Sequence, residues 1–335
     1  MKNKVITILA ACGLNWMTPF IRIASGEEPK EQLRQIWMTL GIPLLAFVIF
    51  LKLWSFTADR IETSLGKIPG PRAVFVQMQG LINEHFEERA KQKEFYKKQI
   101  QMNAQKRLED STAVVKIRKY TGKPTYIDQI RTSLLTVFLG FTIASLVALP
   151  LGVICGLSRA VMTAFNPFIQ IFKPISPLAW LPLVTMVVSA LYVKPNEMFP
   201  KSFVISAITV SLCSLWPTLI NTALGVASLD KDYINVSRVL RLGYFTKIYK
   251  VVIPASLPYI FTGLRISLGV GWMVLIASEM LAQNPGLGKF VWDEFQNGSS
   301  ESLARILVAV FTIGIIGFIL DRVMVMLQSA VNFNR

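Results

Sequence analysis

The feature that most constrains this chain is a series of apolar runs, each long enough to cross a lipid bilayer. Six runs occur, at residues 35–56, 133–157, 174–193, 202–226, 259–282 and 303–327. About 20 residues of apolar helix cover the roughly 30 Å hydrocarbon core of a bilayer. A single segment can satisfy its own amides in lipid only as a helix, and no paired runs of alternating barrel strands are present. We therefore predict an all-α membrane protein with about six transmembrane helices.

The charged and metal-binding residue types argue against several other classes of protein. Charged residues make up 16% of the chain, against roughly 25% in an average soluble domain. The net charge of +15 comes from basic residues spread over loops and one insertion, so nucleic-acid binding is not predicted. The three cysteines, Cys12, Cys155 and Cys213, have no paired spacing, and His85 is the only histidine. We expect no disulfide framework, no metal site and no catalytic residue.

Lysine and arginine in the short loops predict the orientation of the spans, because these residues stay on the cytoplasmic side. The segment between the fourth and fifth runs carries five of them and is placed inside the cell. The segment between the fifth and sixth runs carries three acidic residues against Lys289 alone and is placed outside. An even number of spans then puts both termini in the cytoplasm.

This topology divides the chain into four parts. They are an N-terminal cytoplasmic or interfacial segment (1–34), the first transmembrane helix (35–56), an extracytoplasmic loop (57–131) and a five-helix core (132–335). For the first part we favour an amphipathic segment lying on the inner membrane surface. The alternative is a lipoprotein signal in which Cys12 is lipidated after cleavage.

The extracytoplasmic loop contains a charged insertion at residues 84–123. It holds eleven Lys or Arg against six acids, with few apolar positions. Charge runs of this kind are typical of a solvated, partly helical excursion, which is the interpretation we favour. The alternative is a docking surface for a soluble capture protein.

The loop between the fourth and fifth runs, residues 228–258, reads SLDKDYINVSRVLRLGYFTKIYKVVIPASLP. Asp230 is suited to cap a helix and Asp232 to its first turn, while Arg238 and Arg241 fall later, an order that suits the helix dipole. We predict a short helix whose apolar ridge fits a groove of a cytoplasmic partner, with an interfacial helix on lipid as the alternative. The residues that share one side of it at helical spacing are Val236, Val239, Leu240 and Gly243.

This loop resembles the coupling motif of importer-type ABC permeases, which reads Glu-Ala-Ala, three residues, Gly, nine residues and then Ile-x-Leu-Pro. Aligned on Pro254, the spacing holds. Residues 235–237 take the Glu-Ala-Ala positions and Arg241 the glycine position, so the motif's glutamate and glycine are both replaced. The resemblance implies that the loop couples the chain to an ATPase through Asn235, Val236, Ser237, Arg238, Val239, Leu240, Arg241 and Leu242.

Further segments carry the same resemblance. PISPLAWLPL at residues 174–183, TLINTALGV and IPASLPYIFTGLRI are similar to the nitrate, nitrite, cyanate and bicarbonate branch of the nitrate/sulfonate/taurine importer family. The resemblance is nearly continuous from residue 129 to the C-terminus and does not include residues 84–123. It implies the fold of a type I ABC importer permease with a cytoplasmic coupling helix, in the cytoplasmic (inner) membrane of a bacterium.

The family pattern also implies partners: a second permease copy, two cytoplasmic ATPase subunits and an extracytoplasmic substrate-binding protein, with alternating access driven by ATP. The chain lacks the phosphate-binding pattern GxxxxGK[ST], since NPGLGKF at residues 284–290 has the wrong spacing and lies in an outer loop. ATP and Mg are therefore expected on the partner ATPases, and this chain needs no cofactor and is not an enzyme by itself. Nitrate is the expected substrate, with bicarbonate, cyanate and sulfonates or taurine as alternatives.

Two charges inside the spans are candidates for the translocation path, because intramembrane charges usually face the bundle interior or water. Arg265 and Glu279 lie fourteen residues apart in the fifth run, about 21 Å along a helix, so they cannot pair with each other. Either both have partners on other helices, or they border a hydrated path in which Arg265 compensates the charge of a dehydrated anion. The aromatic candidates are Trp180, beside prolines that interrupt the third run, and Trp216.

Two other classes of protein compete with an ATP-driven importer. A secondary transporter or channel would show inverted repeats and several intramembrane acids. A membrane-embedded enzyme would need a cluster of nucleophile, base or metal ligands within the spans. The sequence shows neither pattern.

Overall fold

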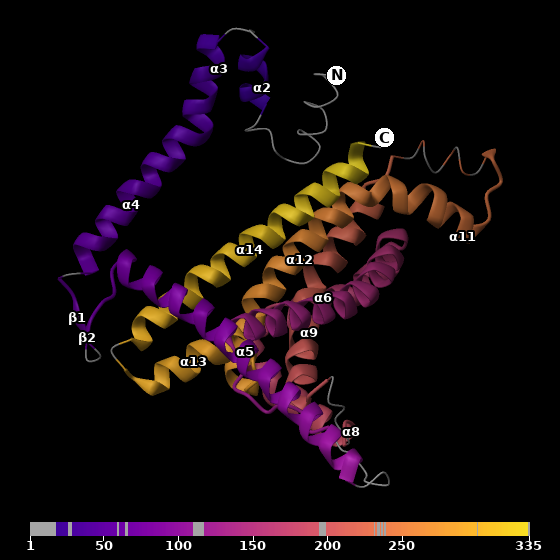
Figure 1. Ribbon diagram of the computed structural model, residues 1–335. Helices are drawn as coiled ribbons and strands as arrows, with labels where there is room; N and C mark the ends of the chain where they lie inside the picture. The colour runs from indigo at the N-terminus through magenta and orange to yellow at the C-terminus, as the bar shows by residue number, and fades with distance from the viewer. Residues whose placement is uncertain are drawn as a thin grey trace.

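Helices make up nearly all of the structure. The computed structural model describes residues 18–333, except residues 26–28, 59, 64–65, 110–116, 194–198, 231, 233–234, 236, 238 and 300. Within these residues the paired strands form one short hairpin, in which β1 (Glu62–Thr63) runs antiparallel to β2 (Gly66–Lys67). Figure 1 shows this hairpin between two helices at one side of the bundle. The prediction of an all-α fold is confirmed.

The helices follow one another in the order labelled in Figure 1. Their bounds are α2 (Thr18–Ala24), α3 (Pro29–Ile36), α4 (Ile42–Ala58), α5 (Pro71–Glu109), α6 (Tyr126–Leu157), α7 (Arg159–Phe172), α8 (Pro177–Leu191), α9 (Lys201–Ala227), α11 (Tyr244–Lys247), α12 (Ile253–Ala282), α13 (Leu287–Asn297) and α14 (Ser302–Phe333). Two π-helical turns, Trp37–Gly41 and Ile248–Val252, connect α3 to α4 and α11 to α12 without a break.

Five helical segments are long and apolar enough to cross a membrane. They are Pro29–Ala58, Tyr126–Leu157, Lys201–Ala227, Tyr244–Ala282 and Ser302–Val331. A sixth span results if α7 and α8, which meet at a bend of 100°, are counted as one broken span. These segments overlap all six predicted runs, so the predicted number of about six agrees with the structure.

The break between α7 and α8 follows from proline chemistry. Pro174 lies in the break, and Pro177 is the first residue of α8, where the N–H that proline lacks would have no helical partner. Ser176 caps α8, since its hydroxyl oxygen accepts from the Leu178 N–H at 3.3 Å. Pro182 lies inside α8 and does not end it. Two of the three prolines expected to interrupt this span therefore mark the break.

The centre of the bundle is formed by α9, which packs against both α6 and α12. Small residues allow the close approach, as is common between membrane helices. A Cβ on Gly140 would lie 2.6 Å from the Ala207 carbonyl oxygen, and a Cβ on Gly263 would lie 3.0 Å from the Thr218 Cα. The Thr218 hydroxyl contacts the Ser267 hydroxyl oxygen at 2.7 Å, which joins α9 to α12. Three of the four candidates for the path lie on these helices: Trp216 on α9, and Arg265 and Glu279 on α12.

One end of the bundle is covered by α13 and the first part of α5. Val74 and Leu81 of α5 belong to the same apolar cluster as the Tyr126 and Phe290 rings, whose centroids are 4.9 Å apart. The helix α4, by contrast, leans away from the bundle in Figure 1. It contacts α14 through Trp54, whose ring centroid lies 5.2 Å from that of Phe311.

Candidate coupling site and translocation path

The predicted coupling helix lies between α9 and α11, and its described residues support a helix with a defined end. Asn235, Ser237 and Val239 are helical, whereas Val236 and Arg238 lie outside the described residues. The Leu242 N–H donates to the Ser237 carbonyl at 3.0 Å, and Arg241 between them has φ 46°. This six-to-one hydrogen bond with a left-handed residue is the Schellman arrangement, in which the left-handed position is usually glycine. Arg241 therefore occupies a position where glycine is physically favoured.

Two apolar side chains at the end of this helix point away from the chain's own core. Val239 is 83% exposed and Leu240 is 63% exposed, while Ser237 is buried. Phe245 and Tyr249, which follow in α11 and the π-helical turn, are also exposed. A short helix that displays apolar side chains in this way presents a ridge to a partner surface or to lipid. Val239 and Leu240, two of the four predicted ridge positions, therefore have exposed side chains.

Glu279, a predicted path candidate, is enclosed by hydrogen bonds that join three helices. Its carboxylate is fully buried, with oxygens 2.9 and 2.8 Å from the Ser133 hydroxyl of α6. It also accepts from the Gly288 N–H at 2.9 Å, while the Leu287 N–H donates to Ser133 Oγ at 2.9 Å. A Cβ on Gly286 would lie 2.1 Å from Glu279 Oε1, so the turn before α13 needs glycine there. These contacts hold the start of α13 against α6 and α12.

Arg265 is paired with an acid on another helix. Its Nε and Nη2 donate to Asp321 Oδ1 and Oδ2 of α14 at 2.5 and 2.9 Å. The Arg265 side chain is 40% exposed and that of Asp321 34% exposed, and the pair borders a cavity of about 220 Å³ that also contacts Trp272 and Met273. The sequence showed Asp321 as an acid within the sixth run, but only the fold brings it to Arg265. Arg265 therefore has the partner on another helix that was one alternative, and the ion pair also borders a cavity.

Trp180 and Trp216 are brought together by a residue that the sequence did not single out. Both stack on Phe172, the last residue of α7, with ring centroids 5.9 and 6.2 Å away and interplanar angles of 25° and 3°. Neither indole N–H has a hydrogen-bond partner among the described residues, although both nitrogens are buried. The three rings fill the bend between α7 and α8. They lie on elements different from those that hold Arg265 and Glu279.

A bundle of membrane-length helices with a short helix that exposes Val239 and Leu240, in a chain whose sequence has no nucleotide-binding motif, fits a transport subunit that depends on an ATPase. Residues 148–333 match the family described as the binding-protein-dependent transport system inner membrane component, and the chain belongs to this family. It is a multi-pass permease subunit of an ABC importer, and it is not itself catalytic. Binding of ATP belongs to a separate ATPase subunit, and the family binds no cofactor. Membership decides against the secondary transporter and the membrane-embedded enzyme.

Among the proteins similar to the chain are two relatives from cyanobacteria and one solved structure. The nitrate import permease protein NrtB of Synechocystis is 37% identical over 203 residues, which cover 61% of this chain and 69% of that protein. The bicarbonate transport system permease protein CmpB of Synechococcus elongatus is 37% identical over 201 residues, 60% of this chain and 67% of that protein. The inward-facing MetNI methionine ABC transporter matches with a TM-score of 0.53 and 13% identity, over 62% of this chain and 95% of that chain. This last likeness shows the fold alone, and the resemblance drawn from the sequence motifs is confirmed.

Proposed function

We propose that the chain translocates a small oxyanion, nitrate first, that it receives from an extracytoplasmic binding protein. The observation that carries the proposal is the 37% identity to NrtB over 203 residues. Bicarbonate is the second candidate, because CmpB is 37% identical over a similar length. Both ions are monovalent and carry three oxygens, so a path that fits one has the size and charge to accept the other.

The transporter is proposed to contain two copies of this chain and two ATPases. Val239 and Leu240 support the contact with an ATPase, because their exposed side chains are suited to a groove of that partner, and Arg241 is suited to acidic groups at the rim of the groove. Movement of the ATPases on ATP binding then displaces this helix and the spans attached to it. Val236 and Arg238 are proposed to belong to the same contact.

The path is proposed to pass Arg265, which compensates the charge that an anion retains when it loses water. The ion pair with Asp321 keeps Arg265 neutralised until an anion competes for the guanidinium. Trp180 and Trp216 are proposed to shape the path at the bend of the broken span. For Glu279 the enclosing hydrogen bonds support a structural role in place of contact with the anion.

The substrate is tested by uptake into proteoliposomes that contain the permease with its ATPases. ATP is supplied on the side of the membrane where the ATPases lie, and the binding protein on the other side. Labelled nitrate and labelled bicarbonate are supplied in parallel, with a non-hydrolysable ATP analogue as the control. We expect ATP-dependent accumulation of nitrate. Accumulation of bicarbonate alone would replace nitrate by the second candidate, and uptake of neither ion would reject the oxyanion proposal.

A further inference from the structure

The helix α5 continues well beyond the bundle. It is 39 residues long, which corresponds to about 58 Å. Its first part is held in the apolar cluster by Val74 and Leu81, and Arg89 forms an ion pair with Asp128 at the start of α6. Residues 90–109 extend about 30 Å further, and Figure 1 shows the lower end of α5 reaching past α13 and α8. We call residues 90–109 together with residues 117–125 the insertion arm.

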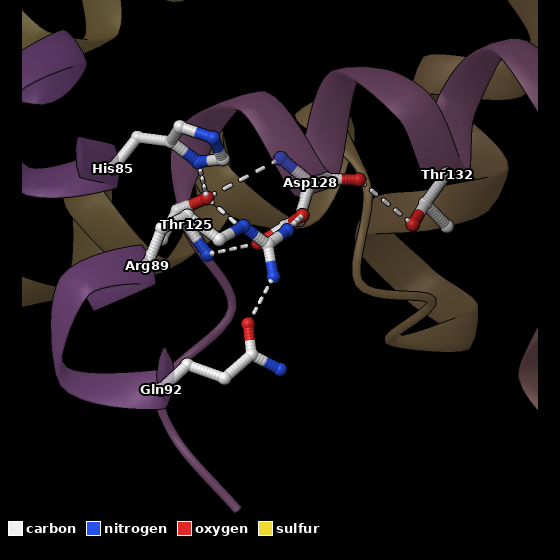
Figure 2. Close-up of polar contacts among 6 residues, drawn as sticks. All are labelled: His85, Arg89, Gln92, Thr125, Asp128 and Thr132. Carbon is white, nitrogen blue, oxygen red and sulfur yellow. Dashed lines mark hydrogen bonds and ion pairs between the residues drawn. The ribbon is translucent and has the colours of Figure 1, made fainter. Parts of the chain in front are cut away.

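The base of the insertion arm is fixed to α6 by the polar contacts in Figure 2. His85 Nδ1 lies 2.6 Å from Thr125 Oγ1, and Arg89 donates to Gln92 Oε1 at 2.8 Å as well as pairing with Asp128. Thr125 and Asp128 also form the capping box of α6, in which the Asp128 N–H donates to Thr125 Oγ1 at 3.4 Å and the Thr125 N–H donates to Asp128 Oδ2 at 3.2 Å. The direction of α5 is therefore set by the first turn of α6.

Further along the insertion arm, the chain that returns toward α6 is bonded to α5. The Gln99 side chain accepts from the Arg118 N–H at 3.0 Å and donates to the Arg118 carbonyl at 3.2 Å. The Tyr120 N–H donates to Tyr96 Oη at 3.2 Å, and the Tyr120 hydroxyl donates to Glu88 at 2.7 Å. This last bond raises the pKa of the Tyr120 phenol above its ordinary value. An arm held at this many points has a fixed orientation, which a solvated excursion does not require.

One face of the insertion arm combines cations with exposed apolar side chains. We call this face the distal stripe, and its members are Lys93, Lys97, Ile100, Ala104, Arg107 and Leu108. Successive members are four, three, four, three and one residues apart, which keeps all of them on one side of the helix. Ile100 and Leu108 are 63% and 87% exposed and border a shallow groove with Ile117 of the returning chain. Arg107 lines the same groove, and residues 91–123 hold ten Lys or Arg against three acids.

We propose that the distal stripe docks the extracytoplasmic binding protein through a surface of that protein with acidic residues around an apolar centre. The inference rests on the proposed function and on the placement of residues 57–131 outside the cell. Complementary charges would steer the encounter, and Ile100 and Leu108 would be buried in the complex. A lipid surface is the less suitable partner, because Lys91, Lys98 and Lys106 lie on the opposite face of the same helix and anionic headgroups would attract both faces.

The test compares two variants that change the net charge equally on opposite faces of the insertion arm. The stripe variant combines Lys93→Glu, Lys97→Glu and Arg107→Glu, and the matched control combines Lys91→Glu, Lys98→Glu and Lys106→Glu. All six side chains are exposed, so neither variant disturbs the bundle. Binding of the system's own binding protein is titrated against the permease–ATPase complex in phosphatidylcholine nanodiscs. We expect the Kd to rise about tenfold or more in the stripe variant and less than about twofold in the control.

The electrostatic and the apolar parts of the contact are distinguished by raising the salt concentration and by substituting one apolar residue. The loss in the stripe variant should shrink as sodium chloride is raised, because exposed charges are screened. Leu108→Ser should weaken binding at every salt concentration, because it removes apolar contact area and no charge.

Three outcomes would overturn the docking proposal. They are wild-type binding in the stripe variant, equal losses in the stripe variant and its control, and a loss seen only when the nanodiscs contain phosphatidylglycerol. In these cases the wild-type complex still binds its binding protein, so the proposed function stands. A wild-type complex that neither binds that protein nor responds to it by increased ATP hydrolysis would reject the proposed function and the docking proposal together.

Discussion

Arg265 and Glu279 lie in one helix, α12, but their side chains are held in different ways. Glu279 is fully buried and accepts hydrogen bonds from two other elements, which accounts for the carboxylate at that position. The pair of Arg265 with Asp321 is more than one third exposed on the arginine side, and exposed pairs contribute about 0–1 kcal/mol to stability. Stability alone therefore does not account for a cation placed within a span.

Exchange of the two partners tests the role of Arg265. Arg265→Gln should lower anion uptake by about tenfold or more and uncouple transport from ATPase stimulation, because an anion loses its compensating charge. The double variant Arg265→Asp with Asp321→Arg restores an ion pair but moves the cation to α14, so we expect assembly to be normal and uptake to remain low. Uptake and the recovery of assembled complex are measured together. Restoration of wild-type uptake by the exchange would show that the pair is purely structural, and failure of Arg265→Gln to assemble would show the same.

For single residues, the sequence predicted that a charge within a span needs a partner, but it did not predict which residue is that partner. Asp321 is 56 residues from Arg265, and Ser133 is 146 residues from Glu279. Contacts between helices that far apart depend on how the helices cross, which the spacing of residues along one chain does not determine. Phe172 was missed for the same reason, since an aromatic residue in an apolar run gives no signal until Trp180 and Trp216 meet it.

The coupling helix is the element on which energy transfer is proposed to depend. Leu240→Asp places a charge on the exposed ridge, where burial of one leucine is worth about 1.5–3 kcal/mol. We therefore expect release of the ATPases, or ATPases that stay bound but do not respond to the loaded binding protein. The amount of permease that reaches the membrane should not change, because Leu240 is exposed in the chain itself. Co-purification of the ATPase and stimulated ATP hydrolysis are the measurements.

Arg241→Gly is the matched comparison for Leu240→Asp. It removes a rim contact but relieves a left-handed conformation that costs a non-glycine residue roughly 1 kcal/mol. Coupling should therefore stay close to wild type, while Leu240→Asp loses it. Wild-type ATPase retention and wild-type uptake in Leu240→Asp would reject this loop as the coupling element.

Elements were predicted with different success, for reasons that lie in their chemistry. The spans and the break at Pro174 followed from hydrophobic length and from the missing N–H of proline. The insertion was expected to be partly helical, and it is helical as far as Glu109, where α5 ends, while residues 117–123 are not helical. The charges of the insertion suggested only that it is solvated. The length of α5 has local causes: Pro71 is suited to a first helical turn, and no further proline follows within the helix. In addition, Lys98 pairs with Glu94 one turn away at 2.6 Å.

For the whole molecule, the match to the family covers residues 148–333, and the insertion arm and α4 lie outside that region. The similarity to MetNI shows how the core helices fold, but a shared fold does not determine which side of the membrane each loop faces. Orientation still rests on the distribution of Lys and Arg in the short loops. A direct test of which loops face the cytoplasm therefore tests the placement of both the coupling helix and the distal stripe.

Labelling of single cysteines with a membrane-impermeant reagent tests the orientation of the chain. In a variant without its native cysteines, Lys98→Cys should be modified in sealed cells, because Lys98 is exposed on α5 and residues 57–131 are proposed to lie outside. Lys247→Cys, on the proposed cytoplasmic side, should be modified only after the cells are opened. Lys98 lies on the face opposite the distal stripe, so this label leaves the proposed docking surface free. Modification of Lys247→Cys in sealed cells would reverse the topology: the coupling helix would then face away from any cytoplasmic ATPase, and the insertion arm would be out of reach of an extracytoplasmic binding protein.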